Sequence, residues 1–301
     1  MPTARPATRG RLALVCALAL EACASTQQPR SAMRYADEAR QAYERAMERF
    51  RDEEWPEAQE LFEAVKRDYS SSRWGWMAEL RLADVAFHQE RFSDALSAYR
   101  SWIRYHPTQA EVAHAQFMIA KCYVAQMPDD WLLVPPSFER DLSSARDADS
   151  ALARFIRDHE DSEHVAEARR LHRQVRQTLA NHELYVAGFY ASRDRWNAAI
   201  HRLLGVIANF EGSGREPRAL VQLGEIYLRT GQQPQARGAF QQVVEEHPRT
   251  PEAQAARNFL ARVGAGPTVP VDASAYRRGS TTTPRPERER ARPAPRRAGQ
   301  S

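Results

Sequence analysis

Apolar and small residues recur along this chain at intervals that fit pairs of packed helices. Near the C-terminus, Gly224 is followed twelve residues later by Ala236, and then by Phe240 and Val243 on successive helical turns. Small residues at such spacing let two helices approach closely, and the aromatic side chain fills the space beside them. Pro248 comes five residues after Val243 and cannot continue a helix. The pattern predicts two helices followed by a turn.

The pattern occurs five times. The alanine of the second helix recurs as Ala58, Ala95, Ala148, Ala199 and Ala236. This is the tetratricopeptide (TPR) signature, and because one unit cannot bury its apolar face alone, neighbouring units must stack. We therefore predict an all-α fold, an α-solenoid of about five TPR helix pairs over residues 34–264. The pairs are placed at about 40–70, 76–107, 113–160, 180–211 and 217–248. A generic helical bundle with alanine-rich packing is the alternative.

Two central units are longer than the others. Residues 127–143 contain three prolines and are predicted to be an insertion within the third unit. Residues 162–193 contain no proline, and no glycine before Gly188, which predicts one long helix or two in near-continuity. The array is thus predicted to have an enlarged middle.

The array is predicted to end in a capping helix at residues 251–263. Thr250 suits the N-cap, Pro251 the first helical position, and Gly264 the stop. Residues 265–301 are dominated by Pro, Arg, Thr and Ala, which predicts a disordered basic tail. Such a tail either contacts an anionic surface or acidic partner, or is solvated without a specific role.

The N-terminus predicts export and lipidation. Leu12–Leu20 is an apolar run behind three arginines, too short for a bilayer, which needs about 20 apolar residues, but suited to a signal peptide. The sequence Leu20-Glu21-Ala22-Cys23 resembles the bacterial lipoprotein cleavage box, although Glu21 departs from the usual small or neutral residue. We predict a lipoprotein signal peptide at 1–22 and a linker at 23–33. A secretory signal cleaved near Ala24 is the alternative.

A lipid on Cys23 is the predicted membrane anchor. Each buried methylene contributes about 0.8 kcal/mol, so several acyl chains attach a protein stably. Ala24, and not an aspartate, follows the cysteine, and the lipoprotein resemblance then implies the outer membrane. Cys122 lies in an apolar helical pattern and is predicted to be a buried, inert thiol.

Charge and motif content argue against nucleic-acid binding and catalysis. The formal net charge of the whole chain is +4, but most of the positive charge lies at its ends. Residues 1–22 carry three Arg against Glu21, and residues 264–301 carry eight Arg against three acidic residues. Residues 23–263 therefore have a net charge of −3. A basic footprint on the folded part is therefore absent from the sequence. His159 and His164 are five residues apart, whereas the helical metal motif needs four. No nucleophile lies in a recognisable catalytic setting.

Four segments resemble one protein family. They are WPEAQELFEAVKRDYSSS, YRSWIRYHPTQAEVAHAQFMIA, ARDADSALARFIRDHEDSEHVAEARRL and YVAGFYASRDRWNAAIHRLLGVIANFEGS. Together with the cysteine box and the enlarged middle, they resemble the BamD (ComL) family of outer-membrane assembly lipoproteins, over about residues 34–263.

The resemblance implies a non-enzymatic scaffold of the Bam complex on the periplasmic face of the outer membrane. Its expected partners are a BamA-like barrel protein, other Bam subunits and unfolded outer-membrane proteins, with no nucleic acid and no cofactor besides the lipid. Another outer-membrane TPR lipoprotein, serving pilus assembly or cell-wall coordination, is the alternative.

The resemblance and the repeat spacing also nominate binding residues. Arg202, in AAIHRLLG, matches a family arginine that pairs with an acidic residue of the barrel protein, and a guanidinium suits that role because it can hold a carboxylate through two hydrogen bonds. The first helix of each unit is expected to line a concave groove for clients, where Phe87 and Phe117 could accept aromatic side chains. Packing is the alternative for each groove residue. The nominated groove residues are Glu44, Glu48, Arg51, Asp84, Phe87, Phe117 and Lys121.

Overall fold

The structure, a computed structural model, describes residues 32–128 and 141–277. Within these residues it contains eleven α-helices and no strand, and the predicted all-α TPR fold is confirmed. The first helices are α2 (Ala32–Arg51), α3 (Trp55–Asp68), α4 (Arg73–His88), α5 (Phe92–Tyr105), α6 (Val112–Ala125) and α7 (Ser143–Asp158). They are followed by α8 (Val165–Ala191), α9 (Trp196–Asn209), α10 (Glu216–Arg229), α11 (Gln233–Glu246) and α12 (Pro251–Val263). A 3-10 turn, η3 (Ser274–Tyr276), comes last.

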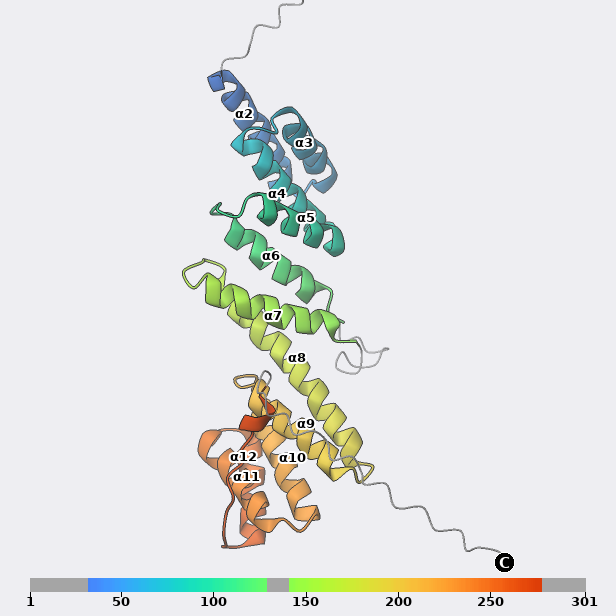
Figure 1. The fold of residues 1–301 in the computed structure, drawn as a ribbon, viewed down its shortest axis with the longest axis vertical. Coiled ribbons are helices and arrows are strands. Elements are labelled where there is room, and N and C mark those ends of the chain that lie inside the picture. The colour runs from blue at the N-terminus through green and yellow to red at the C-terminus, as the bar shows by residue number, and fades with distance from the viewer. Residues whose placement is uncertain (1–31, 129–140, 278–301) are drawn as a thin grey trace, which may run out of the picture. The chain divides into compact units, whose positions relative to one another are not determined.

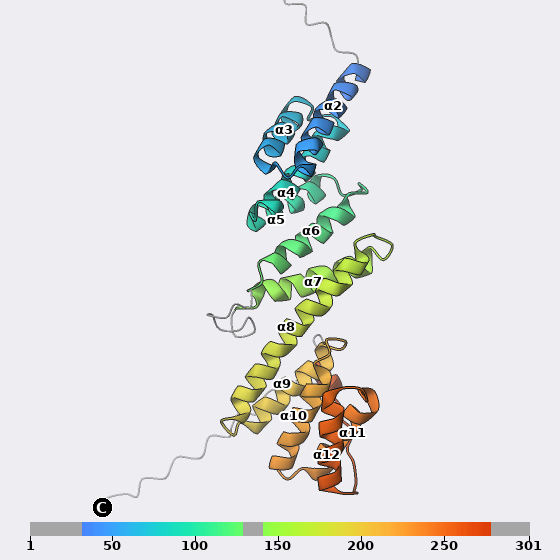
Figure 2. The same ribbon diagram turned by 180° about the vertical axis from the view of Figure 1, so that it is seen from behind.

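The described residues belong to two compact units, and the division falls between Val85 and Ala86, within α4. In the first unit, α2 packs on α3, and Tyr43, Phe62 and Val65 are buried in its core. In the second unit, each helix from α5 to α12 packs on the next one along the chain, as Figures 1 and 2 show. This consecutive packing is what stacked helix pairs require.

The turn between the two helices of a pair has the same geometry in four of the five units. One residue of each turn has a left-handed backbone, with φ of 59° at Glu53, 59° at Glu90, 56° at Asp194 and 76° at Gly231. The next residue then donates its N–H to the carbonyl five positions earlier, for example Arg195 N to Tyr190 O at 3.0 Å. This is the Schellman ending of a helix, which satisfies carbonyls that the helix leaves unpaired.

Close packing at the small positions explains the repeat pattern. A Cβ added at Gly224 of α10 would lie 2.6 Å from the ring of Phe240 on α11, which is too close for two carbon atoms. The ring of Phe240 also stacks on Phe259 of α12, with centroids 4.7 Å apart. Gly224 therefore lets α10 and α11 approach, and the phenylalanine fills the space next to it.

The long interval in the middle of the chain is a single helix. α8 runs without interruption for 27 residues, and its buried residues continue from Val165 through Val175 to Ala187. Its first half packs on α7 and its second half lies beside α9 (Figure 1). α8 therefore serves as the last helix behind the third pair and as the first helix of the fourth.

Residues 265–277, here called the strap, are packed against the array, in contrast to the disordered tail predicted from residue 265. Val269 N donates to Pro234 O at 3.0 Å, and Arg237 Nε donates to Pro267 O at 2.9 Å. Further along, Ala273 is buried. The strap is ordered because its few apolar residues find a surface on α9–α11 whose polar groups satisfy its backbone. Residues 278–301 of the predicted tail lie outside the described residues.

Candidate partner-binding site

Arg202, the arginine nominated as a partner contact, lies on the exposed side of α9. Its Nη1 donates to Oε2 of Glu183 on α8 at 3.0 Å, and the two side chains are 43% and 19% exposed. Water reaches the arginine side of this ion pair and weakens it, whereas the carboxylate of Glu183 is largely covered. The guanidinium retains donors that Glu183 does not use, so it can hold a second carboxylate.

The strap ends against His201, which precedes Arg202 in the sequence of α9. The ring of Tyr276 packs edge-on against His201 with centroids 4.6 Å apart, and Asn209 Nδ2 donates to Tyr276 O at 2.8 Å. Burial raises the pKa of Tyr227 on α10, and Tyr276 raises it further as the smaller cause. The face of α9 that carries His201 and Asn209 is therefore covered, while Arg202 remains accessible.

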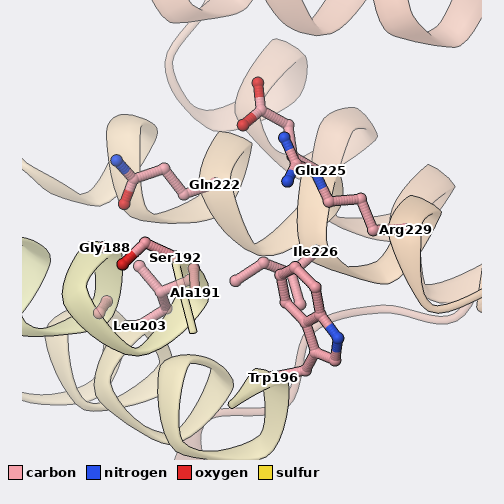
Figure 3. Close-up of a pocket in the computed structure, with 10 residues that line it drawn as sticks. Gly188, Ala191, Ser192, Trp196, Leu203, Gln222, Glu225, Ile226 and Arg229 are labelled. Carbon is pink, nitrogen blue, oxygen red and sulfur yellow. The ribbon is translucent and has the colours of Figure 1, made fainter. Parts of the chain in front are cut away.

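A pocket of about 180 Å³ opens between α8, α9 and α10. Its floor is apolar and made of small or branched residues: Ala187, Ala191, Leu203 and Ile226. Figure 3 shows Trp196 on one side of it, with Gln222, Glu225 and Arg229 of α10 on the other. Gly188 and Ser192 complete the lining. The pocket exists because α8 presents alanine and glycine, which leave space that larger side chains would fill.

Two arginine–aromatic pairs lie at or near this pocket. The guanidinium of Arg229 lies 5.9 Å from the centroid of the Trp196 ring, and that of Arg193 lies 3.6 Å from the centroid of Phe189. Phe189 and Tyr185 of α8 are 45% and 43% exposed, unusually high for aromatic side chains on a packed helix. Rings and guanidinium groups together make a surface suited to a polypeptide partner.

The groove residues predicted in the first unit divide into exposed and buried ones. Glu44, Glu48 and Arg51 are exposed on α2, and Glu44 pairs with Arg40 at 3.5 Å. Asp84 is only 4% exposed, and its Oδ2 lies 2.5 Å from Nη1 of Arg81. The expectation that Asp84 faces a client is therefore corrected: its carboxylate is an internal partner.

The buried arginine of this pair is held in its charged form. Arg81 Nε also donates to the hydroxyl of Tyr43 at 3.2 Å. Burial alone would lower the pKa of Arg81, but Asp84 and Tyr43 outweigh it and raise the pKa above its ordinary value. The cluster therefore stabilises the packing of α4 on α2 in the first unit.

Among the groove residues predicted in the second unit, Phe117 is a core residue. Its ring is 2% exposed, lies parallel to His164 at 4.7 Å and contacts Phe155. The expectation that Phe117 accepts a client's aromatic side chain is therefore corrected, because no surface of the ring is free. It was predicted as a groove residue because an aromatic on the first helix of a pair has the same spacing in either role.

Phe87 and Lys121 remain at the surface of the second unit. Lys121 Nζ lies 5.6 Å from the centroid of Phe87 and 3.5 Å from a carboxylate oxygen of Glu167. Phe87 is half-buried and packs on Phe92. These two residues still qualify as groove residues, but Lys121 already has a carboxylate partner.

The sequence argument missed the pocket on α8–α10. Groove residues were nominated by counting from the small residue on the first helix of each pair. Asp84 directly follows the small residue Ala83, and Lys121 directly follows Ala120. Applied to the last two pairs, the same count points to Gly188 and Glu225, which both line the pocket. Trp196 and Arg229 carry no such signal, because they meet only when three helices pack together.

Cys23, the predicted lipid attachment site, lies outside the described residues. Cys122 is a free, buried thiol. In residues 32–128 and 141–277, no group of three or more His, Cys, Asp or Glu side chains could hold a metal ion. Over the same ranges, none of the helices combines the length and the apolar character needed to cross a membrane.

Comparison with known proteins decides the family. Residues 35–243 match the model of the YfiO family, described as outer membrane lipoprotein. The chain belongs to the YfiO family. Residues 221–278 of this YfiO chain also match a tetratricopeptide-repeat model, which spans the last helix pair, the cap and the strap. The resemblance to BamD-family TPR lipoproteins predicted from the sequence is confirmed.

Curated relatives of the YfiO chain carry one name, outer membrane protein assembly factor BamD. The protein from Caulobacter vibrioides is 25% identical over 59% of this chain, and the match spans 55% of the relative's own length. The protein from Xylella fastidiosa is 22% identical over 68% of this chain and 72% of the relative. The protein from Neisseria meningitidis serogroup A is 22% identical over 69% of this chain and 79% of the relative. Thus the first relative matches over little more than half its length.

One solved structure similar to this YfiO chain is a thermophilic TPR protein of Thermus thermophilus. The two proteins share 16% sequence identity. The match covers 75% of this chain and 98% of the Thermus protein, with a TM-score of 0.32.

Proposed function

We propose that this chain is a non-catalytic, lipid-anchored scaffold that helps assemble β-barrel proteins into the outer membrane. The observation that carries the proposal is the YfiO match over residues 35–243, supported by three relatives named as outer membrane protein assembly factors. Stacked helix pairs suit a scaffold, because they expose long rows of side chains on a rigid frame.

The proposal assigns each region a task. A lipid on Cys23 holds the chain at the periplasmic face of the outer membrane. Arg202 binds a carboxylate of a BamA-like barrel protein, and other subunits of the same complex join the assembly. Glu44, Glu48 and Arg51 on α2, with Phe87 and Lys121, contact unfolded outer-membrane clients. Neither a cofactor nor nucleic acid takes part.

Affinity purification of the full chain from detergent-solubilised outer membrane tests the proposal. Recovery of a barrel protein with periplasmic domains supports it, whereas recovery of pilus or cell-wall proteins alone points to another outer-membrane TPR adaptor. Mass spectrometry of the N-terminal peptide tests the anchor. A Cys23 thioether carrying acyl chains is expected, and an unmodified N-terminus would contradict the lipid anchor.

The contact at Arg202 is tested by titration of the recovered partner. Arg202→Glu should weaken the complex at least tenfold, because two carboxylates then face each other. Arg173→Glu on α8 is the matched control, since Arg173 is equally an exposed arginine but comes well before Glu183 along that helix. Helix content by circular dichroism should be unchanged in both variants. Equal affinity for the wild type and Arg202→Glu would remove Arg202 from the contact surface.

A further inference from the structure

We propose that the strap is a displaceable cover: in its closed position it occupies part of the α9 surface that the barrel partner needs, and the partner binds after the strap opens. The inference rests on the proposed function, because it concerns the regulation of the same Arg202 contact. Four observations carry it: the place of the strap on α9, its sparse burial, the charge beneath it and the glycines that let it close.

The strap lies in the path of a surface that docks at Arg202. Asn209, which donates its Nδ2 to Tyr276 O at 2.8 Å, follows Arg202 by seven residues on α9. Seven residues make almost two helical turns, so the two side chains leave α9 on nearly the same side, about 10 Å apart along its axis. A stable protein interface covers roughly 800 Å² on each partner, which is more than one side chain provides. A partner centred on Arg202 therefore reaches the position that the strap occupies.

The closed strap is held by few contacts. Among its residues only Ala273 is buried, and Val269 is 45% exposed. The half-buried residues of the strap are Val271, Ala275 and Tyr276. Its last turn, η3, packs on α9 (Figure 1). A segment that buries so little surface opens at a lower free energy than the whole domain unfolds. The strap can therefore open while the helix pairs stay folded.

The strap covers a charge that it does not neutralise. Arg237 of α11 is 7% exposed, and Gly266 lies directly against its guanidinium, because a Cβ there would be 2.7 Å from Cζ. The side chain donates from Nε to the neutral carbonyl of Pro267, and among the residues that the structure describes it forms no ion pair. A buried guanidinium without an anion loses hydration that one carbonyl does not replace. Because opening returns water to Arg237, the closed state is only marginally preferred.

Two glycines define the closed position. A Cβ at Gly238 of α11 would lie 1.8 Å from Val269 O, and the Cβ at Gly266 would meet Arg237. The absence of these side chains lets the strap lie on α11, where Val269 N donates to Pro234 O at 3.0 Å. The strap therefore has one specific closed position, to which it can return when a partner leaves.

Thiol labelling tests the opening in the full chain, purified in detergent without a partner. Ala273→Cys places a thiol at the buried position of the strap, and Ala256→Cys places one in the core beneath α12. A maleimide should label Ala273→Cys at least tenfold faster, because local opening exposes it and only wider unfolding exposes the other. Peptide mass spectrometry separates both labels from that of the buried Cys122. Equal labelling rates at the two positions would overturn the proposal.

Two substitutions should move the strap in opposite directions. In the Ala273→Cys chain, Arg237→Met removes the uncompensated charge and should slow labelling about fivefold or more. Gly238→Ala forces the strap off α11 and should accelerate labelling by a similar factor. The matched controls are Arg218→Met, which removes an exposed arginine of α10, and Gly188→Ala, where a Cβ meets nothing within 4 Å. Faster labelling in Arg237→Met would overturn the role of the buried charge.

Titration of the barrel partner tests what the strap controls. Gly238→Ala should bind the partner about threefold or more tightly than the wild type, and Arg237→Met correspondingly more weakly, because a closed strap must first be displaced. Both control variants should bind as the wild type does, with helix content unchanged by circular dichroism. Saturating partner should also accelerate labelling of Ala273→Cys. Binding that neither strap variant alters would overturn this inference alone, whereas failure of the wild type and every variant to bind a barrel protein would contradict the proposed function.

Discussion

Arg202 on α9 is hydrogen-bonded to Glu183 on α8, with 3.0 Å between Nη1 and Oε2. The arginine proposed to bind a partner's carboxylate therefore already holds a carboxylate of its own chain. An exposed ion pair contributes only about 0–1 kcal/mol, and Arg202 is the exposed member of this pair, so an incoming carboxylate can share its guanidinium at low cost. Glu183 competes with the partner and orients Arg202 at the same time.

Glu183→Gln is expected to strengthen the complex with the barrel partner by about two- to fivefold. The substitution removes the competing charge and retains an oxygen that can accept a hydrogen bond from Arg202. Surface plasmon resonance at two salt concentrations measures the change, and the gain should shrink at higher salt because the contact is electrostatic. A loss of affinity would show instead that the orientation of Arg202 by the charged Glu183 matters more than competition.

Breaking the buried ion pair in the first unit should be costly. Arg81→Met removes the guanidinium that pairs with the carboxylate of Asp84, which is 4% exposed, and we expect a loss of about 3 kcal/mol in the free energy of unfolding. The double variant Arg81→Met/Asp84→Leu removes both charges and should recover most of the loss. Urea denaturation followed by circular dichroism measures both. Equal destabilisation of the single and double variants would contradict the pairing.

The strap depends on the absence of a side chain at Gly238. A Cβ there would lie 1.8 Å from Val269 O, so Gly238→Ala must displace the strap and should lower the free energy of unfolding by about 1–3 kcal/mol. In a chain that ends at Gly264 the same substitution should instead stabilise α11 by up to about 1 kcal/mol, because alanine has the higher helix propensity. Thermal melting of the full chain and of the chain ending at Gly264, each with and without Gly238→Ala, measures how the effect of the substitution depends on the strap. The same sign in both backgrounds would argue against the strap contact.

Two helical glycines should respond oppositely to alanine. Gly224→Ala brings a methyl group to within 2.6 Å of Phe240 and should destabilise the last helix pair by about 1–3 kcal/mol. Gly188→Ala meets nothing within 4 Å and should stabilise α8 by about 0.5–1 kcal/mol. Melting temperatures of the two variants measured side by side decide the matter. A stabilising Gly224→Ala would contradict the close packing of α10 on α11.

Helices and their ends could be predicted because short-range rules control them. The alanine–aromatic spacing marked the helix pairs, and Thr250 does accept a hydrogen bond from Ala253 N at the start of α12. Gly264, the expected stop, has a φ of 74°, a left-handed conformation that glycine adopts without strain. These features depend on residues only a few positions apart, so they can be predicted from the local sequence.

The candidate binding residues were harder to predict, because exposure is not a local property. Asp84 and Phe117 have the spacing of groove residues, yet Asp84 meets Arg81, which in turn meets Tyr43, and Phe117 meets His164 from another part of the chain. The strap was predicted to be disordered on composition alone. Composition cannot show that Arg237 and Asn209, 30 and 67 residues away from their strap partners, offer hydrogen bonds to its backbone.

The sequence by itself determined the repeat class, the helix pairs and the family, because each rests on residue type and spacing along one chain. Only the tertiary structure decided which of those residues meet a partner and which meet each other. It paired Arg202 with Glu183, buried Asp84, and brought Trp196 and Arg229 together beside an open pocket. The physical reason is that burial and charge pairing depend on distances between helices, and stacking sets those distances only when the whole array is folded.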